Sequence, residues 1–146
     1  EYMSGKILML VEDNTDDVEL TKLALKNEAV ECKLVVMNDG TEVLDYFSKL
    51  DKSTDIIPDV ILLDLKMSKI GGLEVIKHLR SNDKTRFIPV VILTSSDEER
   101  DIIESYNLGA NSYIRKPVNF EEFCETIRVL GKYWLMLNEH ALKLSG

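Results

Sequence analysis

The chain has 146 residues, of which 45% are hydrophobic and 30% charged, so its length and apolar content suit one domain with a proper core. Its formal net charge of −8 at pH 7 argues against a nucleic-acid-binding domain, because such domains normally carry a basic face. No apolar run approaches the ~18 residues of a membrane span, and Cys32 and Cys124 form no CxxC motif, so we expect a cytoplasmic protein with reduced thiols.

The predicted elements alternate from the start of the chain. A strand is predicted at Ile7–Val11, and Asn14 can cap the amphipathic helix that follows it. A second strand at Lys33–Met37 ends in the turn signal Asn38-Asp39-Gly40. The second helix is carried by the apolar residues Val43, Leu44, Phe47 and Leu50.

The same alternation continues in the second half. Val60–Leu63 is predicted as the third strand, and Gly71-Gly72 precede the third helix. Val90–Leu93 is the fourth strand, and the next helix opens at Asp97, where negative charge suits the helix dipole, and can end at Gly109.

The last unit is a weak strand at Ser112–Ile114 and a helix that Asn119 can cap. Five such strand–helix units, with strands that are continuous apolar runs, predict an α/β fold. We expect a doubly wound, five-stranded parallel sheet with helices on both faces.

Polar residues follow four of the predicted strands. If strands one and three flank the point where strand order reverses, as in the order 2-1-3-4-5, these residues meet at the carboxyl edge of the sheet, where such folds bind ligands. They are Glu12, Asp13, Asp64, Thr94, Ser95 and Lys116.

Three carboxylates in one crevice cannot all stay ionised unaided. Oxygen ligands without a cluster of cysteine or histidine suit Mg²⁺, which commonly takes one or two carboxylates, waters and a phosphate. Lys116 and the hydroxyl of Thr94 could stabilise a phosphoryl group in transfer. A carboxylate beside the metal can act as nucleophile and form an acyl phosphate, so we interpret Asp64 as a phosphate acceptor.

The chain resembles the receiver domain of two-component response regulators over nearly its whole length. Five stretches in order carry the resemblance: VEDN (11–14), ILLDLKM (61–67), GGLEV (71–75), VILTSS (91–96) and NSYIRKP (111–117). The stretches EDNTDDVELTKLALK and KYWLMLN are similar to those of stand-alone cyanobacterial phytochrome response regulators. The family has a flavodoxin-like fold with strand order 2-1-3-4-5, which we expect here.

The resemblance implies roles for the matched positions that surround the metal. Asp64 matches the phosphorylated aspartate, and Asp13 and Asp64 match ligands of Mg²⁺. Glu12 is expected to reach the metal largely through water. The backbone carbonyl of Lys66 matches a further metal ligand.

Other matched positions are expected to handle the phosphoryl group and the switch. Thr94, Ser95 and Lys116 would hold the phosphoryl group. The hydroxyl of Thr94 would move onto that group, and Tyr113 would swing inward with it. The Lys116–Pro117 bond matches a cis peptide of the family.

Loops and helix ends carry further expectations. Ser68 stands where the family usually has proline, so the loop after Asp64 should be looser. Ser96 is expected to cap the fourth helix, and residues 98–101 to form a solvated face of it. His78 and His140 are interpreted as isolated surface residues.

The last helix carries two apolar stripes. One is expected to face the core and comprises Phe120, Phe123, Ile127, Leu130, Trp134 and Leu137. The other comprises Val129, Tyr133 and Met136. It predicts either a wider buried face or a dimer surface shared with the fourth helix and fifth strand. Leu142 and Leu144, past the expected core of residues 6–138, favour a partner.

The resemblance implies a phospho-signalling switch rather than an enzyme. It would be a single receiver domain over 1–146, with 1–5 and 139–146 as terminal extensions. A sensor histidine kinase, such as a phytochrome-like one, would phosphorylate Asp64. Because no output domain follows the last helix, output would be by protein contact, dimerisation or phosphorelay, with neither nucleic acid nor membrane as partner.

Three other functions fit less well. An Mg²⁺-dependent phosphatase of the haloacid-dehalogenase-like kind needs a second aspartate two positions after the nucleophile, where this chain has Lys66. A flavodoxin-like cofactor carrier needs a phosphate loop after strand one, where Glu12-Asp13 would repel a flavin phosphate. A pseudo-receiver that binds partners without phosphorylation is the nearest alternative.

Overall fold

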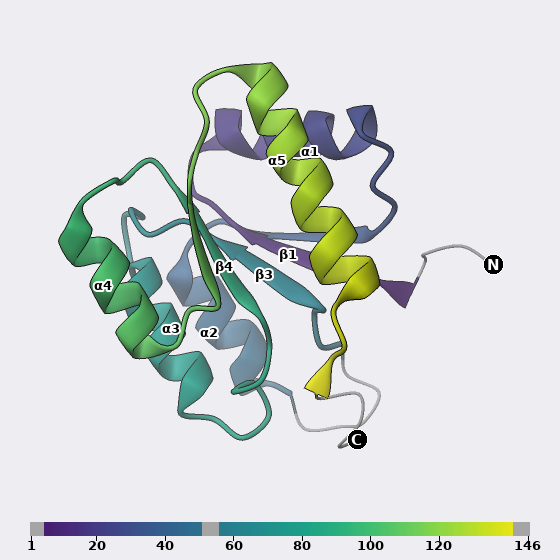
Figure 1. The fold of residues 1–146 in the computed structure, drawn as a ribbon. Coiled ribbons are helices and arrows are strands. Elements are labelled where there is room, and N and C mark those ends of the chain that lie inside the picture. Colours follow the sequence, from purple (N-terminus) through teal and green to yellow (C-terminus); the bar gives the residue numbers. More distant parts are fainter. Residues whose placement is uncertain (1–4, 51–55, 142–146) are drawn as a thin grey trace.

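Five parallel strands form one sheet in the computed structural model, which describes residues 5–50 and 56–141 (Figure 1). The strand order is β2-β1-β3-β4-β5, so the predicted order and fold are confirmed. The bounds agree with the predicted ones to within one residue: β1 Ile7–Val11, β2 Lys33–Met37, β3 Val60–Leu63, β4 Val90–Thr94 and β5 Ser112–Arg115.

Helices cover both faces of the sheet, with α1 and α5 on one face and α2, α3 and α4 on the other (Figure 1). None of the helices in the described ranges is long and apolar enough to cross a bilayer. The bounds are α1 Thr15–Asn27, α2 Gly40–Ser48, α3 Gly72–Arg80, α4 Glu99–Leu108 and α5 Phe120–Gly131, which continues as a π-helix, η2, at Lys132–Leu137.

The core has two layers because successive side chains of a strand point to opposite faces. In β1, Leu8 and Leu10 pack in the layer that contains Ile127 of α5. Met9 and Val11 pack in the other layer, with residues of α2 and α3. Cys124 is buried in the first layer and Cys32 is half-buried against it, and both are free thiols.

The register brings the carboxyl ends of the strands together. Val11 pairs with Leu63 across β1 and β3, so the residues that follow these two strands, Glu12 and Asp64, lie at one edge. Thr94 ends β4 and pairs with Arg115 at the end of β5. The sheet therefore gathers the polar residues that the sequence placed after each strand.

Helix ends largely follow the predicted signals. The side chains of Asn14 and Asn119 cap α1 and α5, and Gly109 ends α4 with a left-handed φ of 111°. The predicted start of α4 is wrong by two residues, because Glu98 rather than Ser96 occupies the N-cap position. Ser96 Oγ donates to Asp101 Oδ2 at 2.6 Å and accepts the Glu98 N–H at 3.3 Å, so its hydroxyl supports the turn before α4 and not the first free N–H groups of the helix.

The predicted buried stripe of the last helix is partly wrong. Phe123, Ile127 and Leu130 are buried as expected, but Phe120 is exposed. The chain then widens into η2, with an i to i+5 bond from the Asn138 N–H to the Tyr133 carbonyl. These wider turns shift the buried side: Leu135 is 1% exposed and Leu137 is 61% exposed.

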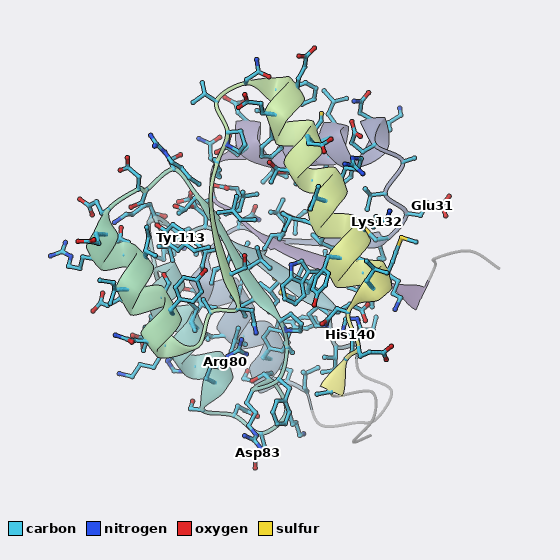
Figure 2. All side chains as sticks on the ribbon, in the orientation of Figure 1. Glu31, Arg80, Asp83, Tyr113, Lys132 and His140 are labelled. Atoms are coloured by element: carbon cyan, nitrogen blue, oxygen red, sulfur yellow. The ribbon has the colours of Figure 1, made fainter. Side chains whose placement is uncertain are left out.

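The second stripe of this helix, Val129, Tyr133 and Met136, is exposed, so the wider buried face is wrong. The dimer surface stays a prediction, and Leu142 and Leu144 lie outside the described residues. His78 is half-exposed beside Glu74, as expected for a surface residue. His140 is not a surface residue: after η2 the chain folds back, and its largely covered imidazole lies 3.8 Å from Asp59, just before β3 (Figure 2).

Candidate functional site

Asp64 is the first residue after β3 and is held against the end of β1. Its backbone N–H donates to the carbonyl of Val11 at 3.1 Å, and its side chain is largely buried. Helix α3 begins close to it, since a Cβ on Gly72 would lie 2.7 Å from the Asp64 carbonyl oxygen. Glycine at 72 is therefore what lets α3 approach the backbone of Asp64 so closely.

Three carboxylates form a cluster around Asp64. Oxygens of Glu12, Asp13 and Asp64 all lie within 4.8 Å of one another. Glu12 and Asp64 are buried, whereas Asp13 reaches solvent. This set offers only hard oxygen donors, so it fits a divalent cation such as Mg²⁺ or Mn²⁺. The backbone of Lys66 lies beside it, with an N–H 3.4 Å from Asp64 Oδ1.

The buried position of Glu12 has an electrostatic cost. Burial raises the pKa of the Glu12 carboxyl to about 7, although the hydrogen bond from Lys116 opposes the rise. Neutralisation by a proton or by a cation would relieve this cost. The pKa of Glu12 therefore supports a cation-binding role for the cluster.

Lys116 reaches into the cluster from the segment after β5. Its Nζ lies 2.6 Å from Glu12 Oε1 and 2.8 Å from Asp17 Oδ2, but 3.9 Å from Asp64 Oδ2. Burial alone would lower the pKa of Lys116, but the carboxylates of Asp17, Glu12 and Asp64 outweigh it and raise that pKa. Lys116 is thus a fixed positive charge within the acidic crevice.

Asp17 is a residue of this site that the sequence did not reveal. It lies in the first turn of α1. Acidic residues are common at helix starts, so the sequence alone did not indicate a role in the site for Asp17. No motif in the sequence distinguishes it from Asp16, the neighbouring acid of the same turn.

The hydroxyl of Thr94 lies on the other side of Asp64. This fully buried residue ends β4, and its Oγ1 donates to Asp64 Oδ1 at 2.8 Å. Ser95 follows it and is exposed. The structure therefore brings Thr94 and Lys116 together around Asp64, in the one crevice that the sequence predicted. Thr94 faces Oδ1 of Asp64 and Lys116 faces Oδ2.

The loop after Asp64 is tied to the cluster. The backbone N–H of Ser68 donates to Asp13 Oδ2 at 3.0 Å. The expected loosening of this loop by serine is thus opposed by a hydrogen bond that proline, which has no N–H, could not make.

A second polar group lies between the two loops that follow β3 and β4. The Nζ of Lys66 is 3.1 Å from Asp101 Oδ2, and the hydroxyl of Ser96 donates to the same oxygen at 2.6 Å. The hydrogen bond from Ser96 lowers the pKa of Asp101 against the effect of burial, and Lys66 adds to it. Asp101 is 5% exposed, so the predicted solvated face at 98–101 is wrong at this residue.

Tyr113 of β5 lies on the α4 side of the sheet (Figure 2). Its hydroxyl donates to the Ser96 carbonyl at 2.9 Å. Burial raises the pKa of this hydroxyl, so it stays protonated and acts as a donor. The predicted cis bond at Lys116–Pro117 is wrong: the bond is trans, the more stable form even before proline.

The fold and the oxygen cluster define a doubly wound α/β protein with an acidic pocket at the switch point of its sheet. The chain belongs to the response regulator receiver domains, because the model of the family "Response regulator receiver domain" matches residues 8–128. Receiver domains bind Mg²⁺ or Mn²⁺ at such an acidic pocket.

Individual relatives agree with this assignment. The chain is 32% identical to response regulator Rcp1 of Synechocystis sp. over 131 residues, which is 89% of each protein. It is 33% identical over 132 residues to the probable methanogenesis regulatory protein FilR2 of Methanothrix harundinacea, covering 90% of this chain and 85% of that protein.

Solved structures place it near phytochrome response regulators. The phosphorylated cyanobacterial phytochrome response regulator RcpA matches with a TM-score of 0.85 at 35% identity, covering 93% of this chain and 98% of that one. Mn²⁺-bound Rcp1 matches with a TM-score of 0.82 at 31% identity, covering 92% and 98%. The chain is thus related to the stand-alone regulators that its sequence resembles.

Proposed function

We propose that this protein is a response regulator that accepts a phosphoryl group on Asp64 and changes its protein contacts as a result. One observation carries the proposal. Asp64 lies in a carboxylate cluster with the Thr94 hydroxyl 2.8 Å from one oxygen and the Lys116 ammonium 3.9 Å from the other. A similar solved structure supports it, that of the phosphorylated cyanobacterial phytochrome response regulator RcpA.

The residues that would hold Mg²⁺ are Asp13, Asp64 and the Lys66 backbone carbonyl, with Glu12 reaching it through water. When bound, the cation would neutralise charge on the phosphoryl oxygens. The oxygen-only donor set and the raised pKa of Glu12 support this assignment.

In the transfer, a carboxylate oxygen of Asp64 forms the new bond to phosphorus. The bond from phosphorus to a histidine nitrogen of the donor breaks, and that nitrogen keeps the electron pair. Lys116 would exchange its contacts with Glu12 and Asp17 for a phosphoryl oxygen. Thr94 would turn its hydroxyl from Asp64 to another phosphoryl oxygen, Ser95 would line the same side, and Tyr113 would follow Thr94 inward.

The kinase partner we propose is a sensor histidine kinase, and a phytochrome-like one fits the relatives best. We propose one receiver domain that works in the cytoplasm without enzymatic turnover of a separate substrate. Output would be through protein contact, phosphorelay or a homodimer. The exposed Val129, Tyr133 and Met136 support a contact surface on the last helix.

The test is incubation with acetyl phosphate, with and without Mg²⁺, followed by intact mass. We expect a Mg²⁺-dependent gain of one phosphoryl group that Asp64→Asn abolishes. Asp16→Asn is the matched control, because Asp16 is an exposed acid in the first turn of α1. No gain under any metal condition would overturn the proposal and favour a pseudo-receiver.

A further inference from the structure

Asp101 is a buried carboxylate that the phosphoryl chemistry does not use. It lies in the first turn of α4, a helix on the other face of the sheet from α1, which carries Asp17 (Figure 1). Negative charge is favoured at a helix start, but that alone does not require burial. A buried charge needs partners, and those of Asp101 come from two other loops.

Both partners bind one oxygen atom. Oδ2 of Asp101 accepts the Ser96 hydroxyl at 2.6 Å and faces the Lys66 ammonium at 3.1 Å. Ser96 belongs to the loop after β4, two residues past Thr94. Lys66 belongs to the loop after β3, two residues past Asp64. One carboxylate therefore joins the two loops that flank the proposed acceptor.

The two contacts differ in how easily they can be broken. The side chain of Lys66 is 62% exposed, so its ammonium can leave Asp101 for another anion without being desolvated. Asp101 is 5% exposed and cannot rehydrate unless the first turn of α4 moves. If the Lys66 ammonium left Asp101, the first turn of α4 would therefore have to move, whereas Lys66 would stay hydrated.

We infer that Asp101 is a positioning residue that holds the Lys66 ammonium on α4, and that a phosphoryl group on Asp64 competes for this ammonium and so loosens the first turn of α4. The inference rests on the proposed phosphorylation of Asp64. A phosphoryl group on Asp64 adds nearly two negative charges. They would lie close to Lys66, whose backbone N–H is 3.4 Å from Asp64 Oδ1.

The consequence extends to Tyr113. Its hydroxyl donates to the carbonyl of Ser96, the same residue whose side chain bonds Asp101. When Lys66 leaves, the Ser96 hydroxyl still bonds Asp101 Oδ2, so Ser96 and Asp101 are expected to move together. The route from Asp64 to α4 through Lys66 thus acts beside the one through Thr94.

The test is amide hydrogen exchange of residues 102–105 in α4, with and without saturating acetyl phosphate and Mg²⁺. Exchange is compared at equal phosphorylated fraction, which intact mass gives for every variant. In the unaltered protein we expect phosphorylation to speed this exchange about fivefold, as loss of an ion pair would. Asp101→Asn should show the faster exchange without phosphate, and phosphate should then add much less than fivefold, because only the route through Thr94 is left.

Three other variants make the result specific. Lys66→Gln removes the cation at an exposed side chain and should lose the same response as Asp101→Asn. Asp101→Glu keeps the charge and should restore the response. Asp97→Asn is the matched control, since Asp97 is an exposed acid next to Ser96 in the loop after β4 and pairs with Arg115 at 3.2 Å. It should respond as the unaltered protein does.

The outcomes separate this inference from the proposed function. If the unaltered protein gains no phosphoryl group, both are overturned. If it is phosphorylated and Lys66→Gln keeps the normal response, this inference alone is overturned, and Asp101 has only a structural role. Should Asp101→Asn fail to fold, Lys66→Gln and Asp101→Glu still decide the question.

Discussion

Ser68 donates its backbone N–H to the carboxylate of Asp13 at 3.0 Å. This hydrogen bond connects the loop after β3 to the loop after β1, the two segments that supply the carboxylate cluster. The bond depends on the backbone and not on the serine hydroxyl. The residue that the family usually has here, proline, would lack the donor.

Ser68→Pro should therefore weaken binding of Mg²⁺. Without the N–H, Asp13 loses a bond that orients it, and loss of such an outer partner commonly lowers metal affinity about tenfold or more. Isothermal titration with Mg²⁺ measures the change. Ser68→Ala keeps the N–H and is the matched control, so equal weakening in both variants would contradict this role of the backbone bond.

Asp17→Asn should speed phosphorylation by acetyl phosphate. Asp17 holds Lys116 at 2.8 Å, and its neutralisation frees the ammonium to move toward Asp64. A partly exposed ion pair is worth ~1 kcal/mol, so we expect a rate increase of about fivefold. Intact mass against time gives the rate. Asp16→Asn, on the same helical turn, should leave it unchanged, and an unchanged rate in Asp17→Asn would argue against restraint of Lys116 by Asp17.

The metal-free protein should lose stability as pH rises from about 4.5 to about 7. The pKa of Glu12 rises from its ordinary 4.5 to about 7 on folding, so in this window the folded state holds a proton that the unfolded state has released. Urea unfolding in a chelator at pH 5 and pH 7.5 measures the loss. Glu12→Gln should reduce it, whereas Glu19→Gln, at an exposed position of α1, should not.

Addition of Mg²⁺ should reverse this trend at the upper end of the window. A cation that binds the folded state adds stability, and it competes with the proton on the cluster. We therefore expect a larger Mg²⁺-dependent rise in the urea midpoint at pH 7.5 than at pH 5. Equal rises at both pH values would contradict a link between Glu12 and the cation.

Gly72→Ala should destabilise the fold by about 1–3 kcal/mol, because an added methyl would lie 2.7 Å from the Asp64 carbonyl oxygen, a backbone atom with little freedom to move. Gly71→Ala is the matched control, since its nearest contact would be 3.4 Å away. Urea unfolding gives both values. A harmless Gly72→Ala would mean that the start of α3 can shift away from Asp64.

Much of this architecture could be predicted because it follows local rules. Apolar runs such as Val60–Leu63 mark buried parallel strands, and a parallel sheet places the residues after each strand, such as Asp64 and Thr94, at one edge. These two rules need only the order of apolar and polar residues along the chain, not the detailed packing of side chains. The site residues could therefore be placed at one edge of the sheet, whereas the strand order 2-1-3-4-5 followed from the resemblance to receiver domains.

The features that escaped prediction depend on partners distant in sequence. Asp101 follows four charged residues and looks solvated, but it is buried where Lys66 and Ser96 bind its carboxylate. His140 is covered because the chain folds back on Asp59. The shift from α-helix to π-helix at Lys132 moves the buried stripe to Leu135 without a composition signal. Each outcome is decided by tertiary contacts that a periodic pattern does not contain.

The site is assembled from the carboxylates that follow β1 and β3, from Thr94 of β4 and from Lys116 after β5, so it exists only in a chain in which these four strands are paired. A partly folded chain, or one with β5 detached, lacks Lys116 beside Asp64. Phosphorylation capacity would then serve as a quality check on the molecule: only copies that have finished folding could enter the signalling pool. Misfolded copies would not compete with them for the kinase's phosphate.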